Sequence, residues 1–198
     1  MKKYLALFLA IVIAPATAQS VIQAQMANVT PAVSRDQVGV SSCGLNFVVG
    51  AMTGDDKAVV YDFSANIYNT GHGVIKAGSH SMVFFAKTGW DMEGKKARAP
   101  GPKLVWLAKR DDSAAIRPEK YIKAESAGFV MGGASLESTV ELLFATADGE
   151  PMQISMEYAS DRIHRVIGFQ ANMTQDDRQA FGACVSGLMK RMEAELMK

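Results

Sequence analysis

Hydrophobic and polar residues alternate along the middle of the chain, and this pattern predicts strands that each bury one face. The clearest case is AVVYDFSANIYN, residues 58–69, in which Val59 starts a series of apolar side chains at every second position. A period of two with β-branched and aromatic residues is typical of such strands. The following NTGHG, residues 69–73, predicts a turn because glycine adopts positive φ angles at little cost. Shorter apolar runs predict further strands at residues 43–52, 74–77, 81–87, 103–109 and 162–169.

A β-hairpin is predicted for residues 138–158, STVELLFATADGEPMQISMEY. Alternate apolar side chains run from Val140 to Phe144 in the first arm, and they recur at every second position from Met152 in the second. Asp148-Gly149 between the two arms is a strong turn signal. We therefore expect two antiparallel strands joined at this dipeptide.

The segment before this hairpin is less regular. Residues 113–128 fit either a short helix that begins at Pro118 or a strand that leads into GFVM, residues 128–131. The glycine pair in MGGAS, residues 131–135, predicts a break in regular structure.

The end of the chain has the pattern of an amphipathic helix. Thr174 is placed to cap its first turn, and Asp177 completes an arrangement similar to a capping box. Asp176 and Asp177 also favour the positive N-terminal end of a helix. One apolar stripe then recurs at helical spacing, formed by Phe181, Cys184, Val185, Leu188, Met192 and Leu196.

The chain contains two cysteines, Cys43 and Cys184, near opposite ends of the predicted folded region. In an exported protein the default for such a pair is one disulfide, and the absence of Cys-x-x-Cys spacing argues against a redox pair. Because Cys184 lies on the apolar stripe, the bridge would fix the helix to the first strand. We therefore predict an α+β domain, mainly an antiparallel β-sheet with a C-terminal amphipathic helix packed on one face.

The first residues indicate export. A basic start with Lys2 and Lys3, an uncharged apolar run and Ala16-Thr17-Ala18 predict a secretory signal peptide at residues 1–18. The apolar run is too short to be a membrane anchor. Residues 19–42 are polar and small, and we expect an N-terminal arm there, followed by a single domain at residues 43–198. The periplasm is the expected location, with full secretion as the alternative.

The charge balance excludes some classes of partner. The chain has 21 Lys and Arg against 20 Asp and Glu, and removal of Lys2 and Lys3 leaves 19 against 20, a formal charge of −1. A chain without a basic field has no global attraction for nucleic acid or anionic lipid. We expect no transmembrane segment after the leader.

The stretch GWDMEGKK, residues 89–96, resembles a phosphate-binding loop only in its outer glycines and one lysine. Asp91 and Glu93 would stand where phosphate would bind, Lys96 replaces the hydroxyl residue, and the prolines that follow oppose a helix. We expect no nucleotide and no other cofactor. The same long loop is nevertheless a candidate binding surface, because basic residues cluster beside a tryptophan. Its candidate residues are Trp90, Lys95, Lys96, Arg98 and Lys103.

The histidines give no metal-binding pattern. His72, His80 and His164 are neither close pairs nor part of a hydrolase elbow, so no metal site is predicted. Met152/Met156 and Met189/Met192 have the spacing of thioether pairs, although core packing explains them more simply.

These observations predict a small, exported, non-enzymatic binding or accessory protein of the bacterial envelope, whose partner is an envelope protein, a glycan or another acidic surface. Two alternatives remain open. One is a periplasmic hydrolase whose site forms only in three dimensions, for example around His80 or His164. The other is a copper or zinc carrier.

Overall fold

The computed structural model describes residues 21–52, 57–84, 102–111, 113–125, 128–158 and 164–197, and of residues 57–58, 79–84 and 164 it describes the backbone alone. Within these residues the chain forms an α+β fold with ten strands and two helices, as the sequence predicts. The strands are β1 (Val21–Arg35), β2 (Val40–Met52), β3 (Lys57–Tyr68), β4 (His72–Phe84), β5 (Leu104–Lys109), β6 (Ala115–Ile116), β7 (Tyr121–Lys123), β8 (Phe129–Ser135), β9 (Pro151–Glu157) and β10 (His164–Gln170). The helices are α1 (Leu136–Ala147) and α2 (Gln175–Leu196).

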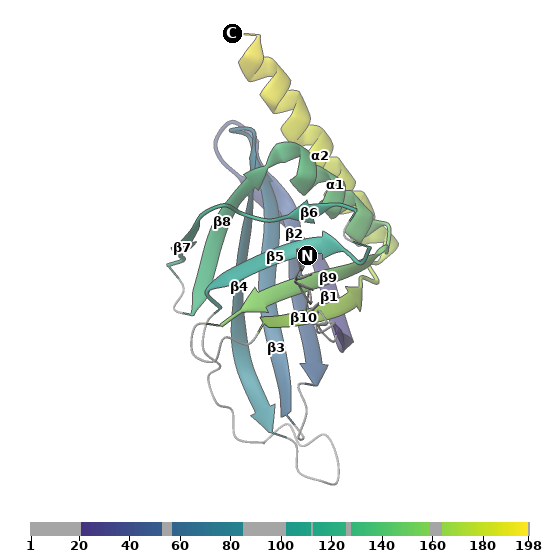
Figure 1. Ribbon diagram of the computed structural model, residues 1–198. Coiled ribbons are helices and arrows are strands. Elements are labelled where there is room, and N and C mark those ends of the chain that lie inside the picture. Colours follow the sequence, from purple (N-terminus) through teal and green to yellow (C-terminus); the bar gives the residue numbers. More distant parts are fainter. Residues whose placement is uncertain are drawn as a thin grey trace, which may run out of the picture.

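The strands form one curled sheet in the order β6-β5-β9-β10-β1-β2-β3-β4-β8-β7. All neighbouring pairs are antiparallel except β1 and β10, which are parallel. Figure 1 shows β5, β9 and β10 crossing in front of β2, β3 and β4, so the sheet folds over into two layers. The Tyr121 hydroxyl of β7 donates a hydrogen bond to the Val105 carbonyl of β5 at 2.7 Å. The two ends of the strand order therefore meet.

Strand β1 connects the two layers, and this finding corrects the expectation of a polar N-terminal arm at residues 19–42. Its first residues, Val21–Gln23, pair with β10, and from Ala24 it pairs with β2. The polar composition misled the prediction because the outer side chains of β1, such as Asn28 and Thr30, are exposed. Val29 on the inner face is buried.

Strand β3 has the alternation that its sequence predicts. Its alternate side chains from Val59 to Ile67 are buried, whereas those between them lie toward solvent. Gly71 has a φ of 83° and forms the predicted turn into β4. The two short strands predicted at residues 74–77 and 81–87 form the single strand β4 over the residues that the structure describes.

The first arm of the predicted 138–158 hairpin is wrong, because residues 136–147 form helix α1. Ser135 caps this helix by accepting a hydrogen bond from the Ser138 N–H at 3.1 Å. The core-facing residues repeat at helical spacing, and this set includes threonines whose hydroxyls bond to backbone oxygens within the helix, Thr139 to Ser135 and Thr146 to Leu142, both at 2.7 Å. The second arm, β9, is confirmed.

The Asp148-Gly149 dipeptide is a turn, but it joins a helix to a strand. Asp148 is the C-cap of α1, and Gly149 follows with a φ of 79°. Such a glycine after the last helical turn is a common way to end a helix. The predicted break at residues 131–135 is also wrong, because they belong to β8, which pairs with β4. The ambiguous segment 113–128 contains two short strands, β6 and β7, in its described part.

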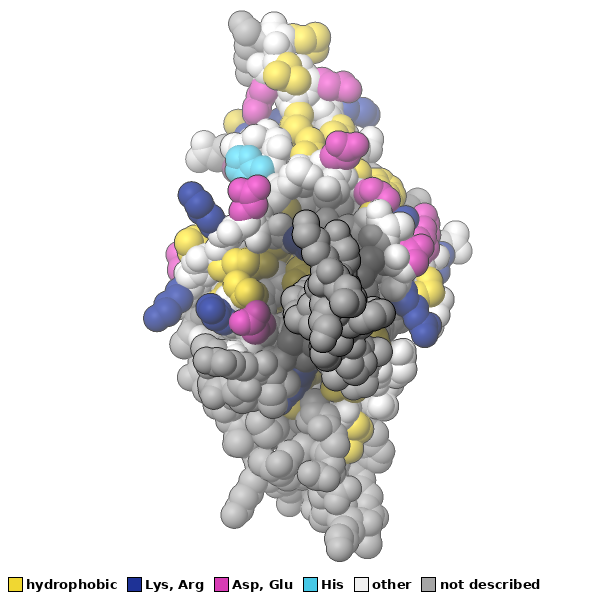
Figure 2. Space-filling view, in the orientation of Figure 1, with side chains coloured by type: hydrophobic (Ala, Val, Ile, Leu, Met, Phe, Trp, Pro, Cys, Tyr) yellow, Lys and Arg dark blue, Asp and Glu magenta, His cyan; other side chains and the backbone are white. Residues whose placement is uncertain are grey.

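Helix α2 confirms the C-terminal prediction. The Thr174 hydroxyl accepts from the Asp177 N–H at 3.1 Å and donates to the Asp177 carboxylate at 2.7 Å. Cys184 on its buried face is joined by a disulfide to Cys43 of β2. Figure 1 shows that the last turns of α2 extend beyond the sheet, and Figure 2 shows acidic, basic and hydrophobic side chains mixed along them. Leu196, the last residue of the predicted stripe, is accordingly exposed.

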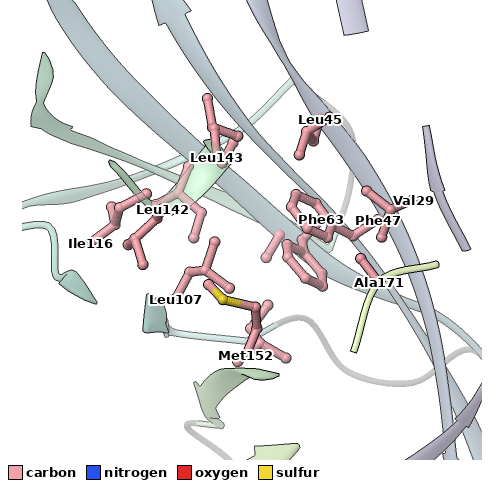
Figure 3. Packing of buried hydrophobic residues seen from close by; sticks show 14 of the residues in the cluster. Val29, Leu45, Phe47, Phe63, Leu107, Ile116, Leu142, Leu143, Met152 and Ala171 are labelled. Atoms are coloured by element: carbon pink, nitrogen blue, oxygen red, sulfur yellow. The ribbon is translucent and has the colours of Figure 1, made fainter. Parts of the chain in front are cut away.

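The core lies between the two layers. Phe47 and Phe63 stack with ring centroids 4.3 Å apart, and Phe169 from the crossing layer meets both rings edge-on at 5.9 Å. Figure 3 shows Leu142 and Leu143 of α1 pointing into this space toward the aromatic rings and the side chains of β5 and β9. Helix α1 therefore fills one end of the space between the layers.

Candidate functional site

A cleft of about 600 Å³ opens where helix α1 begins. It is bounded by His72 at the start of β4, by the end of β8, by Ser138 in the first turn of α1, and by the segment that joins β6 to β7. Its polar lining residues are His72, Arg117, Glu119, Lys120, Ser135 and Ser138. Its volume falls in the range of roughly 300–1,000 Å³ that is typical of small-molecule sites.

The wall formed by residues 117–120 is held in place on three sides. The Pro118 ring packs against Gly132 of β8, where an added Cβ would collide with it. The Arg117 guanidinium lies 4.8 Å from the centre of the Trp106 ring, a cation–π contact with β5. Tyr121, just beyond the wall, is anchored by its hydrogen bond to Val105. The cleft is therefore preformed by side-chain packing.

The floor of the cleft is the N-terminal end of α1. Ser135 donates to the Ser138 hydroxyl at 2.9 Å while it caps the helix. The helix can sit close to β4 because Gly73 has no side chain, and an added Cβ there would overlap Thr139. The first N–H groups of a helix have no partner within the helix, and the helix dipole makes this end positive.

The charge of the lining is also positive. Arg117 and Lys120 contribute two cations against one carboxylate, that of Glu119. Figure 2 shows basic side chains along the side of the molecule where β7 and β8 lie, among hydrophobic and acidic ones. Guanidinium and ammonium groups beside hydroxyl donors are suited to a carboxylate, sulfate or phosphate group. The arrangement can therefore bind an acidic group in the open cleft.

The predicted binding loop lies almost entirely outside the described residues. This applies to Trp90, Lys95, Lys96 and Arg98. Lys103 is described and exposed, and its backbone N–H donates to the Glu157 carbonyl at 2.7 Å, next to the start of β5. It does not line the cleft.

The side chains of His80 and His164 also lie outside the described residues. His72 is exposed, and its Nε2 atom lies 3.1 Å from the Thr70 hydroxyl. Among the three histidines it is the one whose side chain the structure describes, and it lines the cleft together with Ser135 and Ser138.

Within the described residues there is no group of three or more His, Cys, Asp or Glu side chains that could hold a metal ion. Both cysteine sulfurs form the disulfide. Met152 and Met156 are fully buried, and Met189 and Met192 pack against the core. Their burial agrees with the core-packing interpretation of these pairs.

The sequence did not single out Arg117 and Lys120. They occur in RPEK, residues 117–120, a short basic stretch around a proline inside the ambiguous segment. Pro118 was the one local sign of a fixed conformation in this stretch, and in the structure its ring packs against Gly132. No local pattern indicates that this stretch meets the start of a helix, because the contact joins segments that are distant in the chain.

Comparisons of the chain with models of protein families, with curated proteins and with solved structures find no match. No helix in the described part of the chain is long and apolar enough to cross a membrane. The disulfide indicates an oxidising compartment outside the cytoplasm.

Proposed function

We propose that this protein is an exported, non-enzymatic binding protein of the bacterial envelope, and that its cleft binds an acidic group of a glycan or of a partner protein. The periplasm is the proposed location. The leader pattern at residues 1–18 supports export, and the disulfide supports an oxidising destination.

The observation that carries the proposal is the cleft itself. Two cations from one anchored segment, Arg117 and Lys120, lie beside the positive end of α1 in a space large enough for a sugar unit or an acidic side chain. Glu119 and the surrounding hydroxyls can hydrogen-bond to neutral groups of the same ligand. An open cleft with mixed polar lining is suited to reversible recognition.

The proposal is tested with an acidic oligosaccharide, tetragalacturonate, and its neutral counterpart, a galactose tetramer. Binding to the oxidised, exported protein is measured by titration calorimetry. We expect the acidic tetramer to bind and Arg117→Met and Lys120→Met each to weaken binding by about fivefold, because each removes one partly solvated charge pair. Raising the salt concentration should also weaken binding.

Lys123→Met is the matched control. Lys123 is exposed on β7, three residues from Lys120, and does not line the cleft. We expect its affinity to remain within about twofold of the wild-type value, because distant exposed charges are screened by salt. Equal binding of the acidic and neutral tetramers, or equal losses for Lys120→Met and Lys123→Met, would contradict the proposal.

A hydrolase remains the second candidate because His72, Ser135 and Ser138 line the same cleft. Their hydrogen bonds favour binding instead, since Ser135 is occupied with Ser138 and His72 pairs with Thr70. Hydrolysis of either tetramer that disappears in a His72→Ala variant would favour the hydrolase.

A further inference from the structure

A second hollow, of about 300 Å³, lies where strands β1 and β10 separate. Their parallel pairing ends with Gln23 and Gly168, and from Ala24 onward β1 pairs with β2 in the other layer. Pro151 and Met152 at the start of β9 form part of the lining. The volume of the hollow is at the lower limit of the range that is typical of small-molecule sites.

This hollow and the cleft lie at opposite ends of helix α1. The cleft opens at the first turn of the helix. Just after the last turn, the Gly149 carbonyl accepts a hydrogen bond at 2.7 Å from the side chain of Gln170, which lines the hollow. The 12 residues of α1 span roughly 18 Å at 1.5 Å per residue. The hollow is therefore a separate site and not an extension of the cleft.

A β-bulge in β1 places one carboxamide at the hollow. The pairing of β1 with β2 passes from Ala24 directly to Met26, so Gln25 has no partner in the ladder. Its side-chain carbonyl accepts a hydrogen bond from the Met52 N–H at 2.9 Å. Bulges re-aim side chains in this way and are frequent next to active sites. Because the Gln25 carboxamide is fixed by its oxygen, its amino group is the end that can donate to a ligand.

Gln170 of β10 is fixed in the opposite sense. Its side-chain amino group donates to the Gly149 carbonyl, so its carbonyl oxygen is the end that can accept from a ligand. Both Gln25 and Gln170 are exposed, and a ligand can therefore reach them from solvent. The hollow thus offers a donor from β1 and an acceptor from β10.

The rest of the lining combines apolar and polar side chains. Ala27 and Met152 contribute apolar surface, and the exposed Gln23 and Arg110 contribute further polar groups. The Arg110 backbone N–H donates to the first residue of β9 at 3.0 Å, which holds this residue beside the hollow. Among the described residues that line the hollow, Arg110 is the one charged residue. The lining therefore suits a mainly neutral ligand, in contrast to the cleft.

We propose that this hollow is a second binding site, which takes an N-acetylated sugar. An acetamido group has an N–H donor, a carbonyl acceptor and a methyl group. These match the Gln170 oxygen, the Gln25 amino group and the apolar lining. Gln23 and Arg110 can then bond to hydroxyl groups of the sugar ring. The proposal does not rest on the function proposed for the cleft.

The probe is methyl N-acetyl-β-glucosaminide. The control ligand is methyl β-glucoside, which has a hydroxyl in place of the acetamido group. Affinity is measured from backbone chemical shifts during titration of the oxidised protein. We expect the glucosaminide to bind about fivefold more tightly than the glucoside or better, because the glucoside lacks the group that pairs with both glutamines. N-acetylalanine methylamide, which has amide groups without a sugar ring, should bind more weakly than the glucosaminide.

Gln25→Glu tests the predicted donor. It replaces the amino group by an oxygen and keeps an oxygen for the Met52 N–H, so it should melt close to the wild-type temperature. Binding of the glucosaminide should become about tenfold weaker, because a donor is replaced by a charged acceptor. Asn28→Asp is the matched control, because Asn28 is exposed on the same strand and does not line the hollow. Its affinity should stay within about twofold of wild type.

Failure of wild type to bind the glucosaminide, or equal affinity in wild type and Gln25→Glu, would overturn this proposal. Equal binding of the glucosaminide and the glucoside would also overturn it, as would equal losses in Gln25→Glu and Asn28→Asp. Binding of the peptide mimic as tight as that of the glucosaminide would overturn the assignment to a sugar.

Lys120→Met separates the two sites. It should weaken tetragalacturonate binding at the cleft and leave glucosaminide binding unchanged, whereas Gln25→Glu should do the reverse. Either proposal can therefore fail alone.

Discussion

The two ends of the space between the sheet layers are built differently. At the helix end, defined by Cys43, Ile67 and Gly73, helices α1 and α2 close the core and a disulfide joins α2 to β2. The N-cap hydroxyls of both helices accept hydrogen bonds from the first turns. At the tyrosine end, defined by Tyr61, Tyr158 and Arg165, the Tyr61 hydroxyl is fully buried and the Arg165 guanidinium lies 5.1 Å from the centre of the Tyr158 ring.

The two ends therefore differ in where their polar groups lie and in what stabilises the structure around them. A covalent link and satisfied N-caps stabilise the helix end, and its polar groups line the open cleft outside the core. At the tyrosine end the polar groups lie inside the core, where Arg165 and Tyr158 are close to the buried Tyr61 hydroxyl. Three variants at the helix end test how much the disulfide, the packing of α1 on β4 and the contact of α2 with Asp36 each contribute to stability.

The largest effect is expected from removal of the disulfide. The Cys43→Ala/Cys184→Ala variant should lose about 2–5 kcal/mol of unfolding free energy, because the bridge closes a loop across a sequence separation of 141 residues. Urea denaturation measures this loss. Hydrogen exchange should increase more in α2 than in β3 near Tyr61, because the bridge holds the helix directly.

Reduction of the wild-type protein should reproduce the lower stability of the alanine variant. If reduction and substitution both leave the urea midpoint unchanged, the helix end is not stabilised by its covalent link. Equal increases of exchange at both ends would show that the two ends do not differ in local stability.

The next effect is expected at the contact between α1 and β4. Gly73→Ala should lower the unfolding free energy by about 1–3 kcal/mol, because the new Cβ overlaps Thr139 and must displace the helix. Thermal or urea unfolding measures the change. It should also alter the cleft, since the same helix forms the cleft floor.

Gly133→Ala is the control for this substitution. Gly133 lies on the neighbouring strand β8, and a Cβ added there meets nothing within 4 Å. Its stability should stay within about 0.5 kcal/mol of wild type, as for most surface substitutions. A similar loss in both variants would mean that strand propensity, and not the contact with Thr139, determines the result.

Local sequence patterns predicted those elements whose structure is determined by residues within a single segment. The alternation in β3 and the cap and stripe of α2 each lie within one segment, and the disulfide follows from there being two cysteines in an exported chain. Helix α1 was missed because Thr139 and Thr146 face the core with their hydroxyls bonded to the backbone. In a sequence pattern such threonines count as polar, and the remaining residues imitate a strand.

Strand β1 and the cleft depend on partners far away in the chain. Proline disrupts most strands, yet Pro31 is tolerated in β1 because, among the described residues, only Val21–Gln23 pair with β10. The cleft joins His72, the 117–120 segment and Ser135 from three separate parts of the sequence. The predicted loop lies mainly outside the described residues, so its binding role remains a prediction.

The smallest effect is expected from a charged contact at the same end. Arg191 of α2 donates to Asp36 between β1 and β2, with nitrogen–oxygen distances of 2.8 and 2.9 Å. This hydrogen bond, with help from the Val38 N–H, lowers the pKa of Asp36 below its ordinary value of 3.8. Because the folded-state pKa is the lower one, the stabilisation is present above about pH 4 and is lost as the pH falls through the folded pKa.

Asp36→Asn should therefore melt slightly below wild type at pH 7, and the difference should vanish at a pH below the folded pKa of Asp36, where the wild-type carboxyl is also neutral. High salt at pH 7 should reduce the same difference, since the Asp36 carboxylate is exposed and salt screens exposed charges. Melting temperatures at the two pH values and two salt concentrations measure both effects. A pH-independent difference would mean that Asp36 acts through the geometry of the turn. A difference as large as that of the disulfide variant would show that charge, more than the covalent link, holds α2 on the sheet.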